Sequence, residues 1–127
     1  MRIYTGIDIV EVQRVKTSIE NSGPHFLDRV YTKAEQAYCN ARGVHKYESY
    51  AARFAAKEAV AKAFGKGICQ EVSLLMIEVS HTDSGKPYIL LHGSALSLSQ
   101  DMGISAMDLS LTHTAETAAA SVVLLAL

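Results

Sequence analysis

The sequence is poor in cysteine and proline, with only two residues of each. Cys39 and Cys69 are isolated and lack the CxxC spacing of a zinc site, and one pair of cysteines does not make a disulfide framework. We therefore expect free thiols in a reducing compartment, the cytoplasm. The scarcity of proline, together with the lack of any repeat or low-complexity tract, excludes a proline-rich linker.

Long apolar runs and an excess of charge are also missing. No run approaches the roughly 20 residues that a helix needs to cross a bilayer. The opening MRIYTGIDIVEV has an acidic residue inside its apolar run and no small-residue cleavage pattern, so we expect neither a signal peptide nor a membrane partner. The net charge of −1 gives no general attraction to nucleic acid, so any charged partner would have to meet a local patch.

What is present is the composition of an ordinary soluble globular domain. The chain has 127 residues, of which 49% are apolar and 20% are charged, with both signs mixed. This length is typical of one domain with a modest core. We predict a single domain over residues 1–127.

Hydrophobic periodicity predicts the order of the helices and strands. The first segment alternates as a strand, with Ile3, Ile7 and Ile9 on one face. Thr32 and Glu35 form the signature of a capping box at the start of a helix. In the first half we expect a strand at 2–10, a helix from Glu11 to the NSGP at 21–24, a helical turn at 25–30, a helix from Thr32 to Gly43 and a long helix at 48–64. In the second half we expect strands at 73–81 and 88–92, a short helix within 93–103, and strands at 106–114 and 117–127. Helices dominate the first half and hairpins the second, which predicts an α+β fold.

The predicted long helix carries an unusual pair of charges within RFAAKEAVAKAFGKG, residues 53–67. Its alanines suit a helix that other elements contact on several sides, yet Glu58 and Lys62 lie one turn apart on one face. One interpretation is a surface ion pair that stabilises the helix by roughly 0.2–0.5 kcal/mol. The other is a carboxylate metal ligand beside a lysine that meets phosphate, as in magnesium–phosphate sites.

Three further features are ambiguous by themselves. Asp8 interrupts an apolar strand, and a buried carboxylate must be solvated, paired or bound to a cation. His113 shares a strand face with Leu109 and Leu111, so it is either a core histidine or a donor to a phosphate. The DSGKP at 83–87 is by itself only a good hairpin turn.

Taken together, four motifs resemble a known family. GIDIVE (6–11), RFAAKEAVAKAFGKG (53–67), GKPY (85–88) and LSLTHT (109–114) occur in the order and spacing of the holo-acyl-carrier-protein synthases, the short bacterial 4′-phosphopantetheinyl transferases. The resemblance covers essentially the whole chain. It implies a compact domain with an antiparallel sheet packed against a long central helix and shorter helices. It also implies transfer of the 4′-phosphopantetheine arm of coenzyme A to a serine of apo acyl carrier protein, in fatty acid biosynthesis, with release of adenosine 3′,5′-bisphosphate.

The resemblance also implies roles for the three charged residues. Asp8 and Glu58 match the two protein ligands of a catalytic Mg²⁺, and Lys62 matches a lysine that meets the diphosphate of coenzyme A. This set agrees with magnesium chemistry, because Mg²⁺ takes one or two carboxylates and completes its six oxygens with phosphate and water. Two groups could accept the proton of the serine, a water molecule or the Glu58 carboxylate.

Other positions match the family less specifically. The residues expected to bind coenzyme A are Lys46, Arg53, Lys62, Lys66, Gly85, Pro87, Ser110 and His113. The residues expected to bind the acidic carrier protein are Arg14, Lys16 and Arg29, although Glu20 and Asp28 dilute this basic surface. The resemblance further implies a homotrimer with coenzyme A between neighbouring subunits.

A protein with a different class of function could have the same fold. A non-catalytic module that binds coenzyme A or a nucleotide would also resemble this family. The presence of Asp8, Glu58 and Lys62 together argues against such a module, because a binder would not need all three. Thr5 stands where many relatives have a second glycine, a change that a strand should tolerate.

Overall fold

The computed structural model describes all 127 residues. The elements follow in the order β1 (Arg2–Glu11), α1 (Val12–Ser22), α2 (Pro24–Val30), α3 (Lys33–Asn40), α4 (Lys46–Ala63), β2 (Ile77–His81), β3 (Pro87–Leu91), α5 (Gly93–Asp101), β4 (Ile104–His113) and β5 (Thr117–Ala126). None of the helices has the length and hydropathy that a bilayer span requires.

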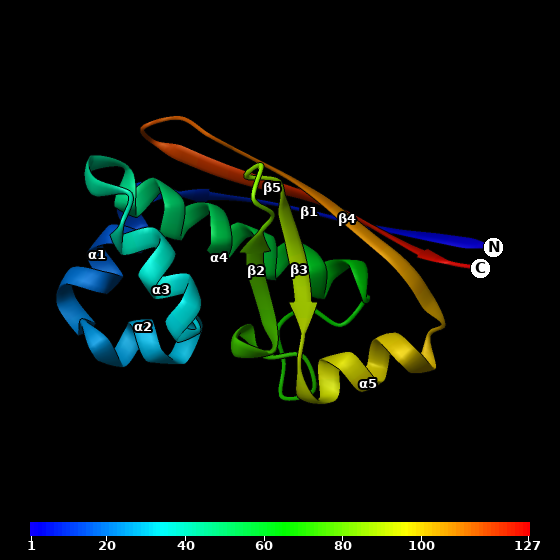
Figure 1. Ribbon diagram of the computed structural model, residues 1–127. Helices are drawn as coiled ribbons and strands as arrows, with labels where there is room; N and C mark the ends of the chain where they lie inside the picture. The colour runs from blue at the N-terminus through cyan, green and yellow to red at the C-terminus, as the bar shows by residue number, and fades with distance from the viewer.

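The strands form two antiparallel sheets. The larger sheet has the order β1-β5-β4, and the smaller one is the β2–β3 hairpin. β1 and β5 pair along their whole length, with Arg2 opposite Ala126 and Glu11 opposite Thr117. This arrangement confirms the predicted α+β class and brings the two ends of the chain side by side (Figure 1).

Helix α4 packs along one face of the three-stranded sheet (Figure 1). Helices α1, α2 and α3 gather near its first half, and the β2–β3 hairpin and α5 lie toward its second half. Seven of its alanines, from Ala51 to Ala63, are at most 4% exposed. These small side chains let strands and helices approach α4 from several sides, as the alanine-rich sequence predicted.

Strand β1 comes closest to α4 at Gly6. A Cβ atom at this position would overlap the carbonyl oxygen of Ala59 and would lie 3.0 Å from the backbone nitrogen of Ala63. Glycine is therefore required for the close approach of the two backbones. Asp8 follows two residues later on the same strand face, so this contact also sets the position of Asp8 relative to α4.

Gly6→Ala is expected to destabilise the protein by about 1–3 kcal/mol, because β1 or α4 must move to admit the methyl group. Urea unfolding followed by circular dichroism measures this change. Ser97→Ala is the control, since Ser97 is exposed on α5, away from β1, and its loss is expected to change stability by at most about 0.5 kcal/mol. Equal losses in the two variants would contradict the proposed close contact.

The other face of the three-stranded sheet has no helix over it (Figure 1). It presents Ile3, Ile7 and Ile9, which are 59%, 69% and 70% exposed, and Val123, which is 43% exposed. The predicted alternation of β1 is confirmed, and the isoleucine face is the one that a single chain leaves uncovered. Contiguous apolar patches of this kind mark interaction surfaces in soluble proteins.

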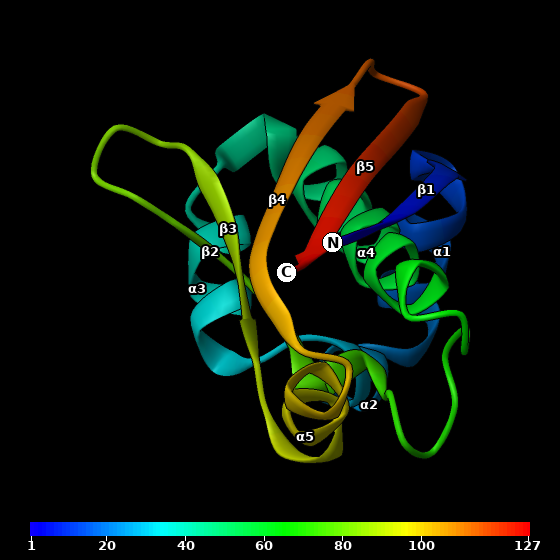
Figure 2. The ribbon, with the colours of Figure 1, turned by 90° about the vertical axis from the view of Figure 1, so that its right-hand side faces the viewer.

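The β2–β3 hairpin lies beside β4 (Figure 2). Its turn contains Gly85 with φ 89°, a conformation that favours glycine, as the turn motif predicted. The strand predicted at 73–81 begins only at Ile77, because the residues before it form one turn of 3-10 helix. The carbonyl oxygen of Leu74 in that turn accepts a hydrogen bond from the buried Lys57 ammonium, a contact that periodicity does not reveal.

The start of α3 agrees with the sequence, and its end does not. The backbone nitrogen of Glu35 donates to Thr32 Oγ1 and that of Thr32 donates to Glu35 Oε1, so the predicted capping box is confirmed. The helix ends at Asn40, before the predicted Gly43. Gly43 has φ 61° and begins a separate 3-10 turn that leads into α4.

Candidate active site

Asp8 and Glu58 line one pocket of about 360 Å³ between β1, α1, α2 and α4. We call it the acid pocket, and its lining residues are Asp8, Ile9, Val10, Arg14, Val15, Ser18, Phe26, Phe54 and Glu58. Asp8 reaches it from β1, Glu58 from the middle of α4 and Arg14 from α1. The fold thus brings together both predicted metal ligands and the leading candidate for carrier-protein binding.

The charges around the acid pocket are coupled. Burial raises the pKa of Glu58, the nearby charge of Asp8 raises it further, and Lys62 opposes both effects. The Lys62 ammonium donates to Asp8 Oδ1 at 2.9 Å and to the carbonyl oxygen of Ile7 at 3.0 Å. Lys62 therefore forms its ion pair with Asp8 across the fold, and the surface pair with Glu58 that helical spacing allows is not formed.

The residues present fit a magnesium ion that is shared with a ligand. No group of three or more His, Cys, Asp or Glu side chains comes together anywhere in the structure, so a cage built only from protein side chains does not form. Mg²⁺ commonly uses one or two carboxylates and takes its other oxygens from phosphate and water. Burial and, after it, the negative charge of Asp8 raise the pKa of Glu58, and a bound cation would counter both effects.

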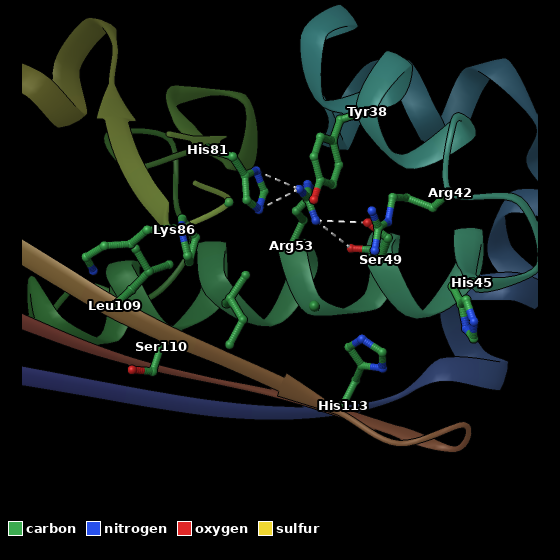
Figure 3. Close-up of a pocket in the computed structure, with 14 residues that line it drawn as sticks. Tyr38, Arg42, His45, Ser49, Arg53, His81, Lys86, Leu109, Ser110 and His113 are labelled. Atoms are coloured by element: carbon green, nitrogen blue, oxygen red, sulfur yellow. Dashed lines mark hydrogen bonds between the residues drawn. The ribbon is translucent and has the colours of Figure 1, made fainter. Parts of the chain in front are cut away.

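A second and larger hollow of about 630 Å³ lies between α3, α4, the β2–β3 turn and β4 (Figure 3). We call it the basic pocket, and its lining residues are Tyr38, Arg42, His45, Ser49, Ala52, Arg53, His81, Gly85, Lys86, Pro87, Leu109, Ser110, Leu111 and His113. It contains five of the residues predicted to bind coenzyme A, namely Arg53, Gly85, Pro87, Ser110 and His113. No carboxylate lines it, so the pocket suits an anion.

The remaining predicted residues lie elsewhere in the single chain. Lys66 pairs with Glu71 at 3.4 Å, and Lys46 lies 5.2 Å from the centre of the Tyr47 ring. Neither lysine lines the acid pocket or the basic pocket. Lys16 also lies over Tyr47, on the side of α1 away from the acid pocket, and Arg29 is exposed on α2.

Sequence reasoning missed several residues of the basic pocket. Tyr38, Arg42 and His81 were not singled out, and they come from α3, the turn after it and the end of β2. Only the packing of α3 and β2 on α4 brings them together. Arg53 was among the residues that the sequence predicted to bind coenzyme A, and its burial is evident only in the structure.

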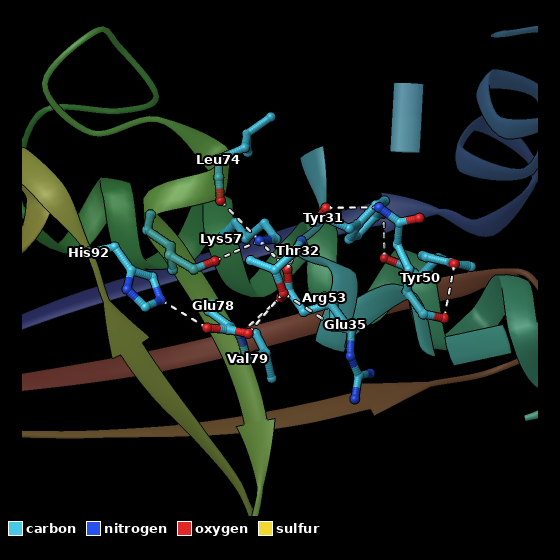
Figure 4. A network of polar contacts seen from close by, with 12 residues as sticks. Tyr31, Thr32, Glu35, Tyr50, Arg53, Lys57, Leu74, Glu78, Val79 and His92 are labelled. Carbon is cyan, nitrogen blue, oxygen red and sulfur yellow. Dashed lines mark hydrogen bonds and ion pairs between the residues drawn. The ribbon is translucent and has the colours of Figure 1, made fainter. Parts of the chain in front are cut away.

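A buried ion pair next to Glu58 was missed as well (Figure 4). The Lys57 ammonium donates to Glu35 Oε1 at 2.8 Å, and both side chains are fully buried. It also donates to the carbonyl oxygens of Leu74 at 2.9 Å and Ile77 at 2.6 Å. This network ties α4, one residue before Glu58, to α3 and to the segment that begins β2.

Lys62 does not line the acid pocket itself, and it reaches this site only through its ion pair with Asp8. Two carboxylates in one pocket and a basic pocket without carboxylates are features that suit a phosphorylated ligand. The chain belongs to the 4′-phosphopantetheinyl transferase superfamily, whose sequence profile matches residues 4–120. This match confirms the resemblance that the four motifs indicated.

Individual relatives agree with this assignment. The chain is 46% identical over 113 residues to the holo-[acyl-carrier-protein] synthase of Ruminiclostridium cellulolyticum, which covers 89% of this chain and 84% of that protein. The crystal structure of the synthase from Neisseria meningitidis superposes with a TM-score of 0.87 at 34% identity, covering 95% of this chain and 96% of that one. The synthase from Helicobacter pylori in complex with coenzyme A gives a TM-score of 0.84 at 32% identity, covering 94% of this chain and 98% of that one.

Proposed function

We propose that this protein transfers the 4′-phosphopantetheine arm of coenzyme A to a serine of apo acyl carrier protein, for fatty acid biosynthesis. The products are holo carrier protein and adenosine 3′,5′-bisphosphate. The observation that carries the proposal is the meeting of Asp8 and Glu58 in one pocket, with Lys62 paired to Asp8, in a chain similar over nearly its whole length to holo-acyl-carrier-protein synthases. Coenzyme A in a related structure supports the identity of the donor.

Asp8 and Glu58 would hold Mg²⁺ in the acid pocket, each through a carboxylate oxygen. When bound, the ion would neutralise negative charge that develops on the phosphate oxygens during transfer. Lys62 is half-exposed, so its ammonium can turn from Asp8 toward a bound diphosphate. There its positive charge would stabilise the leaving adenosine bisphosphate. Neither Cys39 nor Cys69 lines the acid pocket, in keeping with direct transfer to the serine.

The basic pocket would receive the nucleotide end of coenzyme A. Arg53, Lys86 and His113 supply positive charge or N–H donors along its walls. Gly85 lets the backbone of the β2–β3 turn come close to a ligand, since it carries no side chain. Lys46 and Lys66 remain proposed phosphate contacts that a neighbouring subunit would have to bring to the site.

We also propose that the protein is a homotrimer with active sites between subunits. The isoleucine face of the three-stranded sheet is uncovered in one chain, and burying it would stabilise an assembly. The acid pocket and the basic pocket have no lining residue in common, so pockets of two neighbouring subunits can serve one coenzyme A. Light scattering of the purified protein measures the mass of the assembly.

A cytoplasmic location belongs to the same proposal. Cys39 is a buried free thiol and Cys69 is an exposed free thiol. An exposed thiol is kept reduced in the cytoplasm, where the expected carrier protein and coenzyme A would also have to be present.

One assay tests the catalytic function. The protein is incubated with apo acyl carrier protein, coenzyme A and Mg²⁺, and the carrier is then weighed by mass spectrometry. We expect the mass of one phosphopantetheine to be added, in a reaction that stops when the metal is chelated. An unchanged carrier mass, with coenzyme A bound to the protein, would instead indicate the non-catalytic binding module.

Arg14→Ala is expected to raise KM for the carrier protein about tenfold, the effect of losing one hydrogen bond to a charged group. KM for coenzyme A should rise less than KM for the carrier protein, because Arg14 lies on the α1 side of the acid pocket and has no part in the basic pocket. Steady-state kinetics with each substrate varied in turn measures both constants. Arg2→Ala is the control, because Arg2 lies six residues and about 20 Å along β1 from Asp8. An equal rise in both KM values would refute the docking role.

A further inference from the structure

The basic pocket contains a buried arginine whose charge no carboxylate balances. Arg53 is 2% exposed and takes part in none of the ion pairs of the structure. Its Nη1 donates to Ser49 Oγ at 2.9 Å, and its buried Nε has no hydrogen-bond partner. A buried, unpaired charge is costly, so this site is electrostatically incomplete without an anion.

Two aromatic side chains hold the guanidinium group of Arg53 in place (Figure 3). The Tyr38 and His81 rings stack with centroids 4.3 Å apart and 3° between their planes. Arg53 Cζ lies 4.1 Å from the centre of the Tyr38 ring, and Arg53 Nη2 lies 3.1 Å from His81 Nδ1 and 3.3 Å from His81 Nε2. We call Tyr38, Ser49, Arg53 and His81 the Arg53 clamp. The clamp orients the guanidinium before any ligand arrives, which lowers the entropic cost of binding.

The surroundings of His81 favour its neutral form in the empty clamp. Arginine can only donate hydrogen bonds, and both ring nitrogens of His81 lie within 3.3 Å of Arg53 Nη2, so the unprotonated nitrogen of a neutral ring is the one that accepts. Burial lowers the pKa of His81, and the charges of Arg53 and Arg42 lower it further. The titratable groups that share the pocket with His81 include no acid, and they are Tyr38, Arg42, His45, Arg53, Lys86 and His113.

Two acids beside the pocket, Glu48 and Asp108, are paired with other groups, and Asp83 in the β2–β3 turn is exposed to solvent. Glu48 Oε2 lies 2.8 Å from His45 Nδ1 and 3.5 Å from His113 Nδ1. Asp108 pairs with Lys86 at 2.7 Å. An anion that enters the basic pocket is therefore the group best placed to favour a positive charge on His81.

If coenzyme A is the donor, as in the proposed function on which this inference rests, one of its phosphate groups suits the basic pocket better than the others. The diphosphate would lie with the metal ion and Lys62 at the acid pocket. The remaining 3′-phosphate is a monoester, which carries about −1.5 to −2 charges at pH 7 because its second pKa is about 6. A pocket without carboxylates, which holds an unneutralised guanidinium, fits this dianion.

We propose that His81 couples binding of the 3′-phosphate monoester of coenzyme A to the uptake of one proton. The proton passes from solvent to the ring nitrogen that accepts from Arg53, and that hydrogen bond is lost. Arg53 Nη2 is then free to donate to the phosphate, and the imidazolium adds a second cation and another N–H donor. Tyr38 is a positioning residue that keeps both groups in the clamp.

Isothermal titration calorimetry in two buffers of different ionisation enthalpy measures proton uptake on binding. The ligands are coenzyme A and 3′-dephospho-coenzyme A, which lacks the monoester. His81→Gln keeps an acceptor for Arg53 but cannot gain a proton, and His25→Gln, on the exposed surface of α2, is the matched control. We expect coenzyme A to bring extra proton uptake in the wild type and in His25→Gln, and none of this extra uptake in His81→Gln.

The affinities should follow the same pattern. A rise of one unit in the pKa of His81 on binding corresponds to about a tenfold gain in affinity. The advantage of the wild type over His81→Gln for coenzyme A should be largest at low pH. It should fall about tenfold as the pH rises through the two pKa values of His81. The ligand's own titration is the same for both proteins, so it cancels in this ratio.

Each other outcome overturns a specific statement. Equal proton uptake by His81→Gln and wild type, or equal uptake with both ligands, would overturn the coupling while leaving the proposed function intact. Failure of coenzyme A to bind the wild type would overturn the proposed function and the coupling together. NMR titration of the His81 ring in the wild type needs no variant, and a His81 pKa that coenzyme A does not raise would also overturn the coupling.

Discussion

Glu58→Gln and Asp8→Asn are each expected to lower kcat/KM for phosphopantetheine transfer about 100-fold or more. Either change removes one of two carboxylates that would bind the metal, and a catalytic metal stabilises the transition state by several kcal/mol, with each 1.36 kcal/mol worth about tenfold in rate. Both substitutions keep the size of the side chain, so the acid pocket should keep its shape. The rate at which the carrier protein gains mass measures the loss.

Folding should respond differently from activity in the two variants. The pKa of Glu58 is raised by burial and by Asp8, so its charged form weakens the fold as the pH rises above the unfolded-state pKa. Glu58→Gln removes this repulsion, and its Tm at neutral pH should be unchanged or higher. Asp8→Asn loses the partly exposed ion pair with Lys62, which is worth at most about 1 kcal/mol.

Direct metal binding provides a second measurement. Calorimetric titration with Mg²⁺ in the presence of coenzyme A should show weaker binding in both variants. Asp101→Asn is the control, because Asp101 is exposed at the end of α5 and forms no ion pair. Full activity in either variant, or wild-type metal affinity, would count against the metal assignment.

Local sequence patterns predicted most elements of the fold. Alternation located β1, β4 and β5, the alanine-rich pattern located α4, and the capping box located the start of α3. These features depend on residues close together in the chain. The late start of β2 was missed because it depends on Lys57, seventeen residues before Leu74, whose carbonyl oxygen it binds.

The acid pocket was predicted through motifs and the basic pocket only in part. Asp8 and Glu58 are charged residues in apolar or small-residue segments, so each is conspicuous in the sequence. Tyr38 and His81 look ordinary in sequence, and their role depends on the packing of α3 and β2 against α4. Which sheet face is left uncovered could not be predicted either, because isoleucines on one face of a strand are equally consistent with a core.

The buried Lys57–Glu35 pair explains how α4 keeps one orientation. All three donors of the Lys57 ammonium have partners, on α3 and on the segment that begins β2. Glu35 Oε2 also accepts from the backbone nitrogen of Val79, so the carboxylate joins α3 to β2 as well (Figure 4). Burial lowers the pKa of Lys57 and Glu35 opposes that shift, so each charge depends on the other. Rotation of α4 would break these bonds and carry the adjacent Glu58 away from Asp8.

Lys57→Met is therefore expected to destabilise the protein by about 3–5 kcal/mol, because it leaves the Glu35 carboxylate buried without a counter-charge. Urea unfolding gives the free energy. Lys33→Met is the matched control, since Lys33 forms an ion pair with Asp28 at the same 2.8 Å distance but is 82% exposed, and its loss should cost at most about 1 kcal/mol.

The double variant Glu35→Leu/Lys57→Met measures the interaction between the two charges separately from their contacts with the rest of the protein. Removing both charges leaves no buried ion unpaired, so the double variant should be more stable than the sum of the single losses implies, with a coupling of about 1–3 kcal/mol. Losses that simply add, or a Lys57→Met loss no larger than that of Lys33→Met, would show that the two charges do not depend on each other. In that case the orientation of α4, and with it the meeting of Glu58 and Asp8, would have to come from the alanine packing alone.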